Sequence, residues 1–283
     1  MRVLIGFDGS PGADDAVELA RWLTAGDEGE ALLVNVLPHP GALPVAYYLL
    51  DDEETPWERE FFTTAAAKLA PLAVRWASYV GGSPAQILTA TAENDGFELI
   101  VIGSPHRGTV GRALLGSVAQ GVLHGAPVPV AVAPRGYAGE RHDPLGKIAV
   151  AYDGSAESEA ALASAVALAS RHGAALELLT VATIAPVTPS FPGLKFPPAP
   201  TPGEVIEQGL AAVGEGVEAS GRELHAGSIP SGLLAACEDA DLLVAGSRGY
   251  GTLGRVLVGS VSSELVDLAP CPVVVVPRPD DGD

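Results

Sequence analysis

The sequence predicts an α/β protein made of two tandem domains, each an open five-stranded parallel sheet with helices on both faces. Three observations predict this class. The glycine-rich segment 103–118 recurs at 246–261, and ten positions are identical at an offset of 143 residues. Short, continuously apolar strands alternate with helical segments in both halves, which is typical of parallel sheets covered on both faces. Apolar residues make up 47% of the chain while aromatic residues make up 5%, which suits small-residue helices on aliphatic strands.

Each domain begins with the same local pattern. A strand at 3–7 or 148–152 is followed by Asp-Gly-Ser. Ser10 and Ser155 are predicted to be helix N-caps, and Pro11 occupies the first helical position in the first half. This recurrence predicts a first domain at 1–136 and a second at 146–278, joined by a short linker.

The remaining elements follow in the same order in both halves. The first half has predicted strands at 31–36, 75–79, 99–102 and 128–132, and the second has them at 176–181, 223–226, 242–245 and 272–276. The segment from Ser83 to Gln86 predicts a capping box with proline at the first helical position. Its counterpart helix is predicted to begin near Ser231. The proline-rich segment 186–202 is predicted to be a surface insertion.

The charge balance restricts the partners. The chain has 35 acidic and 16 basic residues, which gives a net charge of −19. Such a surface repels nucleic-acid backbones and anionic membranes, so neither is an expected partner. A single nucleotide stays compatible because it needs only a local group of donors. We find no targeting segment and no apolar stretch long enough to span a membrane, and we therefore expect a cytoplasmic protein.

A candidate site lies where the first and fourth strands of each domain end. In open α/β sheets, ligands bind outside the carboxyl ends of the strands, where the strand order reverses. There Asp153 would face Gly246–Gly249, and Asp8 would face Gly103–His106. Glycines let the backbone approach a phosphate, and the following helix offers free N–H groups. The aspartates could accept hydrogen bonds from adenine or ribose, although Asp-Gly is also a common turn dipeptide.

The spacing in the second half carries a family resemblance. Gly246 is followed after two residues by Gly249, and after nine more by Gly259-Ser260. This pattern resembles that of the universal stress proteins, and the likeness covers nearly the whole chain except the proline-rich segment and the termini. It implies a Rossmann-like fold of the adenine nucleotide alpha hydrolase type, a stress-response role, and ATP as the ligand. The sequence leaves metal dependence open, although Mg²⁺ commonly accompanies a bound triphosphate.

By this resemblance, the nucleotide contacts lie mainly in the second half. They are Asp153, Val181, Ala245, Gly246, Arg248, Gly249, Gly259, Ser260 and Val261. The matching positions of the first half are Asp8, Val36, Gly103, Gly116 and Ser117. There His106 replaces the second glycine, and its side chain would either crowd the phosphate path or donate a hydrogen bond to it. We expect the second half to bind nucleotide in preference to the first.

The sequence lacks the motifs of several phosphate-processing enzymes. It contains no Walker P-loop, no Gly-x-Ser-x-Gly nucleophile elbow and no histidine pair at metal-binding spacing. We therefore expect an ATP-binding regulatory protein with an unidentified protein partner, not an enzyme, in which any hydrolysis is slow and incidental. The alternative is a nucleotide-free scaffold that acts through protein–protein contacts. Nucleotidyl transfer or hydrolysis is a third option.

The last strand of each half predicts how the two domains meet. By the resemblance, single-domain relatives dimerise through this strand. The strands at 128–132 and 273–276 could therefore pair within one chain and form a pseudo-dimer, which covers two valine-rich edges. The chain would then act as a monomer or assemble into a homodimer. Cys237 and Cys271 lack metal-type spacing, and we expect them to be buried thiols.

Overall fold

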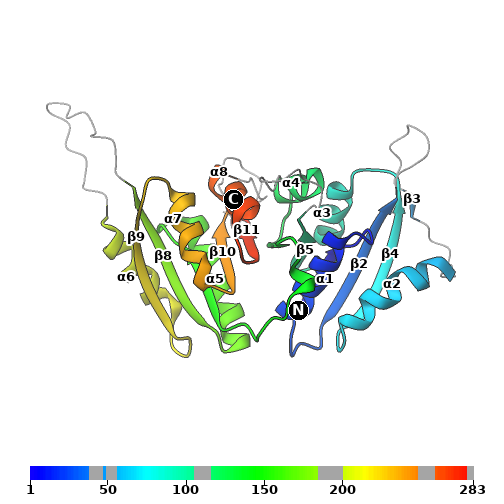
Figure 1. The fold of residues 1–283 in the computed structure, drawn as a ribbon, viewed down its shortest axis with the longest axis horizontal. Helices are drawn as coiled ribbons and strands as arrows, with labels where there is room; N and C mark the ends of the chain where they lie inside the picture. The colour runs from blue at the N-terminus through cyan, green and yellow to red at the C-terminus, as the bar shows by residue number, and fades with distance from the viewer. Residues whose placement is uncertain (38–46, 49–55, 105–115, 184–199, 248–258, 279–283) are drawn as a thin grey trace.

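The computed structural model of the chain describes residues 1–37, 47–48, 56–104, 116–183, 200–247 and 259–278 (Figure 1). The elements of the first half are β1 (Arg2–Gly6), α1 (Pro11–Leu23), β2 (Glu30–Leu37), β3 (Tyr47–Tyr48), α2 (Pro56–Lys68), β4 (Ala73–Val80), α3 (Pro84–Asp95), β5 (Leu99–Gly103), α4 (Ser117–Leu123) and β6 (Val130–Ala133). A 3₁₀ turn, η1 (Tyr137–Gly139), lies between the halves.

The second half repeats the alternation of strands and helices. Its elements are β7 (Lys147–Ala151), α5 (Ala156–His172), β8 (Ala175–Thr183), α6 (Pro202–Val213), β9 (Ala219–Ala226), α7 (Ile229–Ala236), η2 (Cys237–Asp239), β10 (Leu242–Gly246), α8 (Ser260–Leu268) and β11 (Val273–Val276). The short strand β3, which pairs antiparallel with β4, has no counterpart in the prediction.

All strands of the described residues join one eleven-stranded sheet in the order β3-β4-β2-β1-β5-β6-β11-β10-β7-β8-β9. Within each half the five predicted strands are parallel, and the two halves meet where β6 and β11 pair antiparallel. Ala131 lies opposite Val274 at the centre of this pairing. The intrachain pseudo-dimer predicted from the valine-rich strands is therefore confirmed, and Figure 1 shows its two halves side by side.

Helices cover both faces of the sheet. Side chains from α1, α2, α5 and α6 form one buried cluster, and side chains from α3, α4, α7 and α8 form another on the opposite face. Successive residues of a strand point to opposite faces, so Val3 and Ile5 enter the first cluster while Leu4 enters the second. This two-sided burial explains why the strands are continuously apolar.

Two helix starts match the prediction and two differ from it. Ser10 and Ser155 cap α1 and α5, because each hydroxyl accepts a hydrogen bond from a backbone N–H three residues later. Ser83 precedes α3 but makes no cap hydrogen bond, so the predicted capping box is wrong. In the second half the cap is Ser228, and Ser231 is its reciprocal partner in the first turn.

The segment between the halves is bound to α1. The Asp15 carboxylate, 2% exposed, accepts hydrogen bonds from the N–H groups of Gly136 (3.0 Å) and Ala138 (2.8 Å). The indole N–H of Trp22 donates to the carbonyl oxygen of Asp143 at 2.8 Å. These contacts hold the chain segment between β6 and β7 in place. Among the helices described, none is long and apolar enough to cross a membrane.

Candidate functional site

A cavity of about 420 Å³ lies at the carboxyl ends of β7, β8 and β10 in the second half. Strand β7 lies between β8 and β10, so the chain order reverses beside it, and ligand sites of open α/β sheets form at such a point. Five of the residues predicted to bind nucleotide line this cavity: Asp153, Val181, Ala245, Gly246 and Val261. Folding therefore brings together residues from four separate stretches of sequence.

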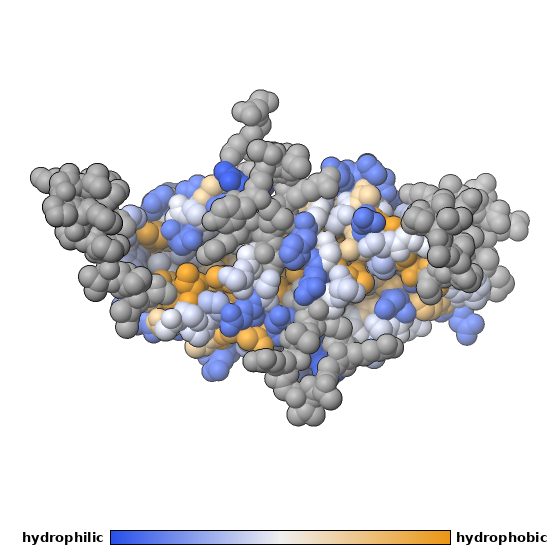
Figure 2. Space-filling view, turned by 90° about the horizontal axis from the view of Figure 1, so that it is seen from above, coloured by the Kyte–Doolittle hydropathy of each residue, from blue (hydrophilic) through white to orange (hydrophobic). Residues whose placement is uncertain are grey.

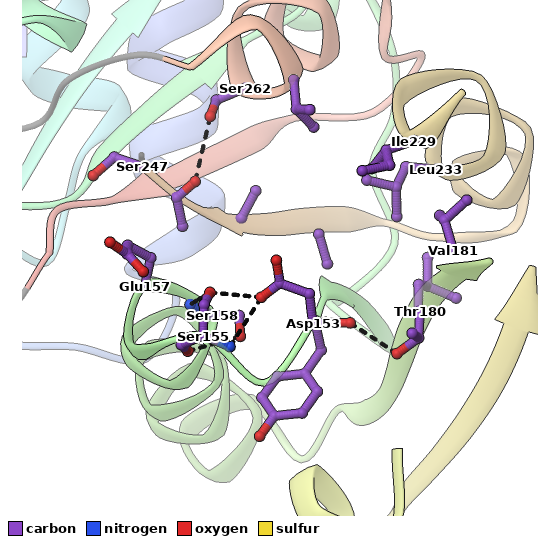
Figure 3. A pocket seen from close by; sticks show the side chains of 16 residues that line it. Asp153, Ser155, Glu157, Ser158, Thr180, Val181, Ile229, Leu233, Ser247 and Ser262 are labelled. Carbon is purple, nitrogen blue, oxygen red and sulfur yellow. Dashed lines mark hydrogen bonds between the residues drawn. The ribbon is translucent and has the colours of Figure 1, made fainter. Parts of the chain in front are cut away.

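The cavity has an apolar side and a polar side (Figure 3). Val181 from β8 and Ile229 and Leu233 from α7 form the apolar side, and Ile229 is 39% exposed. Ser155 and Ser158, at the start of α5, lie on the opposite, polar side. Asp153 lies between the polar side and the apolar side. A ligand with an apolar ring at one end and polar groups at the other would match this division.

Asp153 is held by the helix that follows it. Its Oδ1 atom accepts hydrogen bonds from the Ser155 N–H at 3.0 Å and from the Ser155 hydroxyl at 2.5 Å. Burial is the largest single influence and raises the pKa of Asp153, but the hydrogen bonds from Ser155 and Ser158 together outweigh it and hold the pKa below its usual value. The side chain therefore presents a fixed, ionised carboxylate to the cavity.

Gly246 ends β10 where the strand passes close to the first turn of α5. A Cβ at this position would lie 2.5 Å from the carbonyl oxygen of Glu157. Gly103, the matching residue at the end of β5, is pressed in the same way against the backbone of Gly12. Close packing of the backbone therefore accounts for a glycine at both positions, whether or not a ligand binds.

Val261 and Ser262, in the first turn of α8, line the same cavity, whereas the predicted residues Gly259 and Ser260 lie just before them and are not part of its lining. Gly259 is the N-cap and carries no side chain to bond the first N–H groups of the helix, and Ser260 begins the helix at the surface. The Ser262 hydroxyl donates to the Gly246 carbonyl at 3.3 Å and ties α8 to β10. The hydroxyl of Ser247, the residue after Gly246, is buried and has no hydrogen-bond partner among the described residues.

The first half places its matching residues in the same elements. Asp8 follows β1 and accepts a hydrogen bond from the Ser10 N–H at 3.0 Å. Val36 lies in β2. Gly116 is the N-cap of α4, and Ser117 is the first residue of that helix.

An aromatic side chain distinguishes the surroundings of Asp8 from those of Asp153. The ring of Phe61, from α2, contacts Phe7 edge to face and lies within 2.7 Å of where a Cβ on Gly9 would be. In the second half, the corresponding neighbour of Gly154 is the smaller Val205, at 3.6 Å. The first half thus has Phe61 where the second has Val205, and neither residue belongs to the glycine motif.

Three residues named from the sequence lie outside the described ranges. They are His106 in the first glycine-rich segment, and Arg248 and Gly249 in the second. Within those ranges, no group of three or more His, Cys, Asp or Glu side chains is arranged to hold a metal ion.

Sequence reasoning missed several residues that line the cavity. Thr180, whose hydroxyl donates to the Tyr152 carbonyl at 2.8 Å, directly precedes the predicted Val181. Ser158 follows the predicted N-cap by three residues, a spacing that could have drawn attention to it. Ile229 and Leu233 had no such signal, because they resemble any apolar pair at helical spacing.

Comparison with known proteins identifies the family. The model of the universal stress protein family matches residues 1–134 and, separately, 144–277. A universal stress protein of Mycobacterium tuberculosis (strain CDC 1551 / Oshkosh) is 30% identical over 291 residues, with 96% of this chain and 95% of that protein covered. Another, from Mycobacterium bovis (strain ATCC BAA-935 / AF2122/97), is 29% identical over 200 residues, and the match spans 64% of each chain.

A solved structure supports the same assignment at the level of the fold. The crystal structure of a universal stress protein from Archaeoglobus fulgidus DSM 4304 matches with a TM-score of 0.69 and 24% identity, covering 98% of both chains. The likeness extends through both halves, in agreement with the repeated match of the family model. With two tandem copies of its domain, the chain belongs to the universal stress protein family.

Proposed function

We propose that the cavity of the second half binds an adenine nucleotide, with ATP as the expected ligand, and that the protein is a regulatory component of a stress response. The observation that carries this proposal is the joint presence of an apolar side, an ionised carboxylate and the uncapped start of α8 around one cavity. Each group matches a different part of a nucleotide.

The cavity suits such a ligand in size and chemistry. Its volume of about 420 Å³ lies within the range of roughly 300–1,000 Å³ that is usual for small-molecule sites. The base would pack beside Val181 and Leu233, and Asp153 would accept hydrogen bonds from ribose hydroxyls. The phosphates would extend toward Gly259 and Ser260, where free N–H groups and the helix dipole favour negative charge. A ligand oxygen could also pair with the buried hydroxyl of Ser247.

A divalent cation would enter with the phosphates. Glu157 lines the polar side of the cavity, and the guanidinium of Arg278 approaches its carboxylate to 3.8 Å. Since the described residues offer no cage of metal ligands, Mg²⁺ would be bound mostly by the phosphate oxygens and water, which is its usual habit. The cation would then reduce the repulsion between the phosphates and Glu157.

A regulatory role fits the surroundings of the cavity better than rapid catalysis. The described lining contains no histidine or lysine, and its ionised carboxylate, Asp153, is already held by two hydrogen bonds from Ser155. We propose that nucleotide occupancy changes contacts with an unidentified protein partner, and that any hydrolysis is incidental. We also propose domain limits of 1–136 and 146–278, and a monomer or homodimer built on the pseudo-dimer.

Titration calorimetry with ATP and Mg²⁺ tests the site through two matched substitutions. Gly259→Glu adds a negative charge at the N-cap of α8, and Gly116→Glu adds the same charge at the N-cap of α4. Both glycines have extended backbone angles that glutamate adopts without strain. We expect Gly259→Glu to weaken ATP binding by at least about tenfold. Gly116→Glu should leave the main binding event unchanged.

Other outcomes would support other functions. Equal losses in both variants would contradict the preference for the second half. A melting temperature of the wild-type protein that does not rise with ATP would favour the nucleotide-free scaffold, because a bound ligand stabilises the folded state. ATP turnover that scales with protein concentration and disappears in Gly259→Glu would indicate an enzyme.

A further inference from the structure

The two cysteines of the chain lie together in the second half. Cys237 opens η2 directly after α7, and Cys271 lies two residues before β11. They are 1% and 8% exposed, respectively, and both belong to the buried cluster that α7 and α8 form against the sheet. Although they are 34 positions apart in the sequence, the backbone brings them close together: the Leu243 N–H donates to the carbonyl of Pro272, the neighbour of Cys271, at 3.0 Å, and the Ala240 N–H donates to the Cys237 carbonyl at 3.2 Å. Each thiol shifts the pKa of the other, and no disulfide joins them.

The two thiols differ in their readiness to ionise. The hydrogen bond from Cys271 lowers the pKa of Cys237 against the opposing effect of burial, and the positive charge of Arg222 adds to the lowering. The same contact and burial raise the pKa of Cys271. A sulfur that ionises more readily is therefore paired with one that keeps its proton, and the thiolate is the form that reacts with oxidants.

Arg222 gives a second, independent sign that this pair is more than core packing. Its Nη2 atom donates to the carbonyl of Ala236, the residue before Cys237, at 3.4 Å, and pairs with Glu177 at 3.0 Å. Its Nε atom is buried and has no hydrogen-bond partner among the described residues. The guanidinium of Arg222 thus lies at the end of α7 with an N–H group that no described residue accepts. Its positive charge favours the ionised form of Cys237.

We propose that Cys237 and Cys271 form an oxidant-responsive site that closes to a reversible intrachain disulfide when it meets hydrogen peroxide. The Cys237 thiolate attacks one peroxide oxygen, the O–O bond breaks, and hydroxide leaves and takes up a proton as water. The Cys271 sulfur then attacks the resulting sulfenic acid, so that an S–S bond forms, the S–O bond breaks and a second water leaves. A small dithiol reverses the oxidation.

Both cysteines lie in turns between a helix and a strand, and these turns include exposed residues. Glu238 and Pro270, the residues next to Cys237 and Cys271, are exposed. Brief opening of these turns would admit a molecule as small as peroxide without unfolding of the sheet. The new bond would link the end of α7 to the chain that enters β11, and α7 also carries the Leu233 wall of the cavity.

The chain of 283 residues tests the proposal directly, since these are its only two cysteines. Reduced protein is treated with hydrogen peroxide and followed by thiol titration, intact mass and peptide mapping. We expect both thiols to disappear, the mass to fall by two hydrogens, and the peptides that contain Cys237 and Cys271 to be cross-linked in a monomeric chain. Dithiothreitol should restore both thiols.

Variants of two basic residues test the role of Arg222. Arg222→Gln should slow the oxidation to less than about one half, because loss of the guanidinium raises the pKa of Cys237 and lowers its thiolate fraction. Lys147→Gln is the control, since Lys147 also pairs with Glu177 (2.9 Å) and should leave the rate unchanged. In Cys271→Ser, the Cys237 sulfenic acid should persist and be trapped by dimedone.

Several results with the wild-type protein alone would overturn the proposal. They are oxidation to sulfinic or sulfonic acid without a cross-link, disulfides formed only between chains, and thiols that react only after unfolding in urea. Equal oxidation rates of Arg222→Gln and the wild type would contradict the proposed role of the Arg222 guanidinium in ionising Cys237.

Discussion

At Gly246, two explanations for the absence of a side chain coincide, and the glycine motif cannot separate them. The motif suggests that the side chain is absent so that a phosphate can approach the backbone. The structure shows that the backbone of Glu157 already occupies the space where a Cβ would lie. Packing between β10 and α5 would thus require a glycine here in the absence of any nucleotide.

Gly246→Ala should therefore destabilise the protein without ligand. We expect a loss of about 1–3 kcal/mol in the free energy of unfolding, because α5 or β10 must shift to accommodate the methyl group. Urea denaturation in nucleotide-free buffer measures this loss. Gly203→Ala in the first turn of α6 is the control, since nothing lies within 4 Å of its added Cβ. Should both variants be equally stable, the packing explanation would be wrong.

At the scale of single elements, a serine before a proline does not guarantee a helix cap. Ser10 and Ser83 both precede a proline at the first helical position, and the sequence predicted a cap at each. Only Ser10 accepts a hydrogen bond from the helix, from the Ala13 N–H at 3.2 Å. The serine–proline pattern predicted the start of both helices correctly. Whether the serine hydroxyl points toward the helix depends on its neighbours in the fold, which the pattern does not describe.

Two serine-to-alanine variants measure this difference. Ser10→Ala should lower the free energy of unfolding by about 1 kcal/mol, because an N–H group of α1 loses its acceptor. Ser83→Ala should change it by less than about 0.5 kcal/mol, as expected for a surface substitution without a lost contact. Chemical denaturation of both variants under the same conditions gives the comparison. A cost at Ser83 equal to that at Ser10 would contradict the observed cap geometry.

At the scale of the whole molecule, the two halves are held in one arrangement by more than the pairing of β6 with β11. The linker is bound to α1 through Asp15 and Trp22. Across the halves, the Arg171 guanidinium lies 3.3 Å from the Asp27 carboxylate, and the His172 ring contacts the Leu23 carbonyl at 3.0 Å. The ends of α1 and α5 thus meet on one side of the sheet.

Asp15 is the residue of this arrangement best suited to a test. Asp15→Ala should cost about 2–4 kcal/mol in the free energy of unfolding, because two linker N–H groups lose a buried, charged acceptor. Asp14→Ala is a matched control and should cost less than about 1 kcal/mol, since its exposed carboxylate forms a long ion pair with Lys68, at 4.0 Å. Thermal denaturation monitored by intrinsic tryptophan fluorescence would report both effects. Equal stability of the two variants would refute the proposed role of Asp15 in fixing the linker.

The sequence by itself determined the features that depend on local periodicity and on duplicated spacing. These include the alternation of strands and helices and the two tandem domains. The family followed from the resemblance that the glycine spacing carries, and that resemblance in turn implied the pairing of the strands at 128–132 and 273–276. It also placed Asp153 and Val181 at strand ends that proved to be neighbours in one cavity. Such residues could be predicted because strand order in a doubly wound sheet brings particular strand ends together.

Only the tertiary structure decided which surfaces distant segments present to each other. The apolar wall formed by Ile229 and Leu233, the approach of Glu157 to Gly246 and the meeting of Cys237 with its partner thiol carry no local signature. The physical reason is that burial and contact depend on the packing of whole helices against the sheet, whereas motif and periodicity describe one segment at a time.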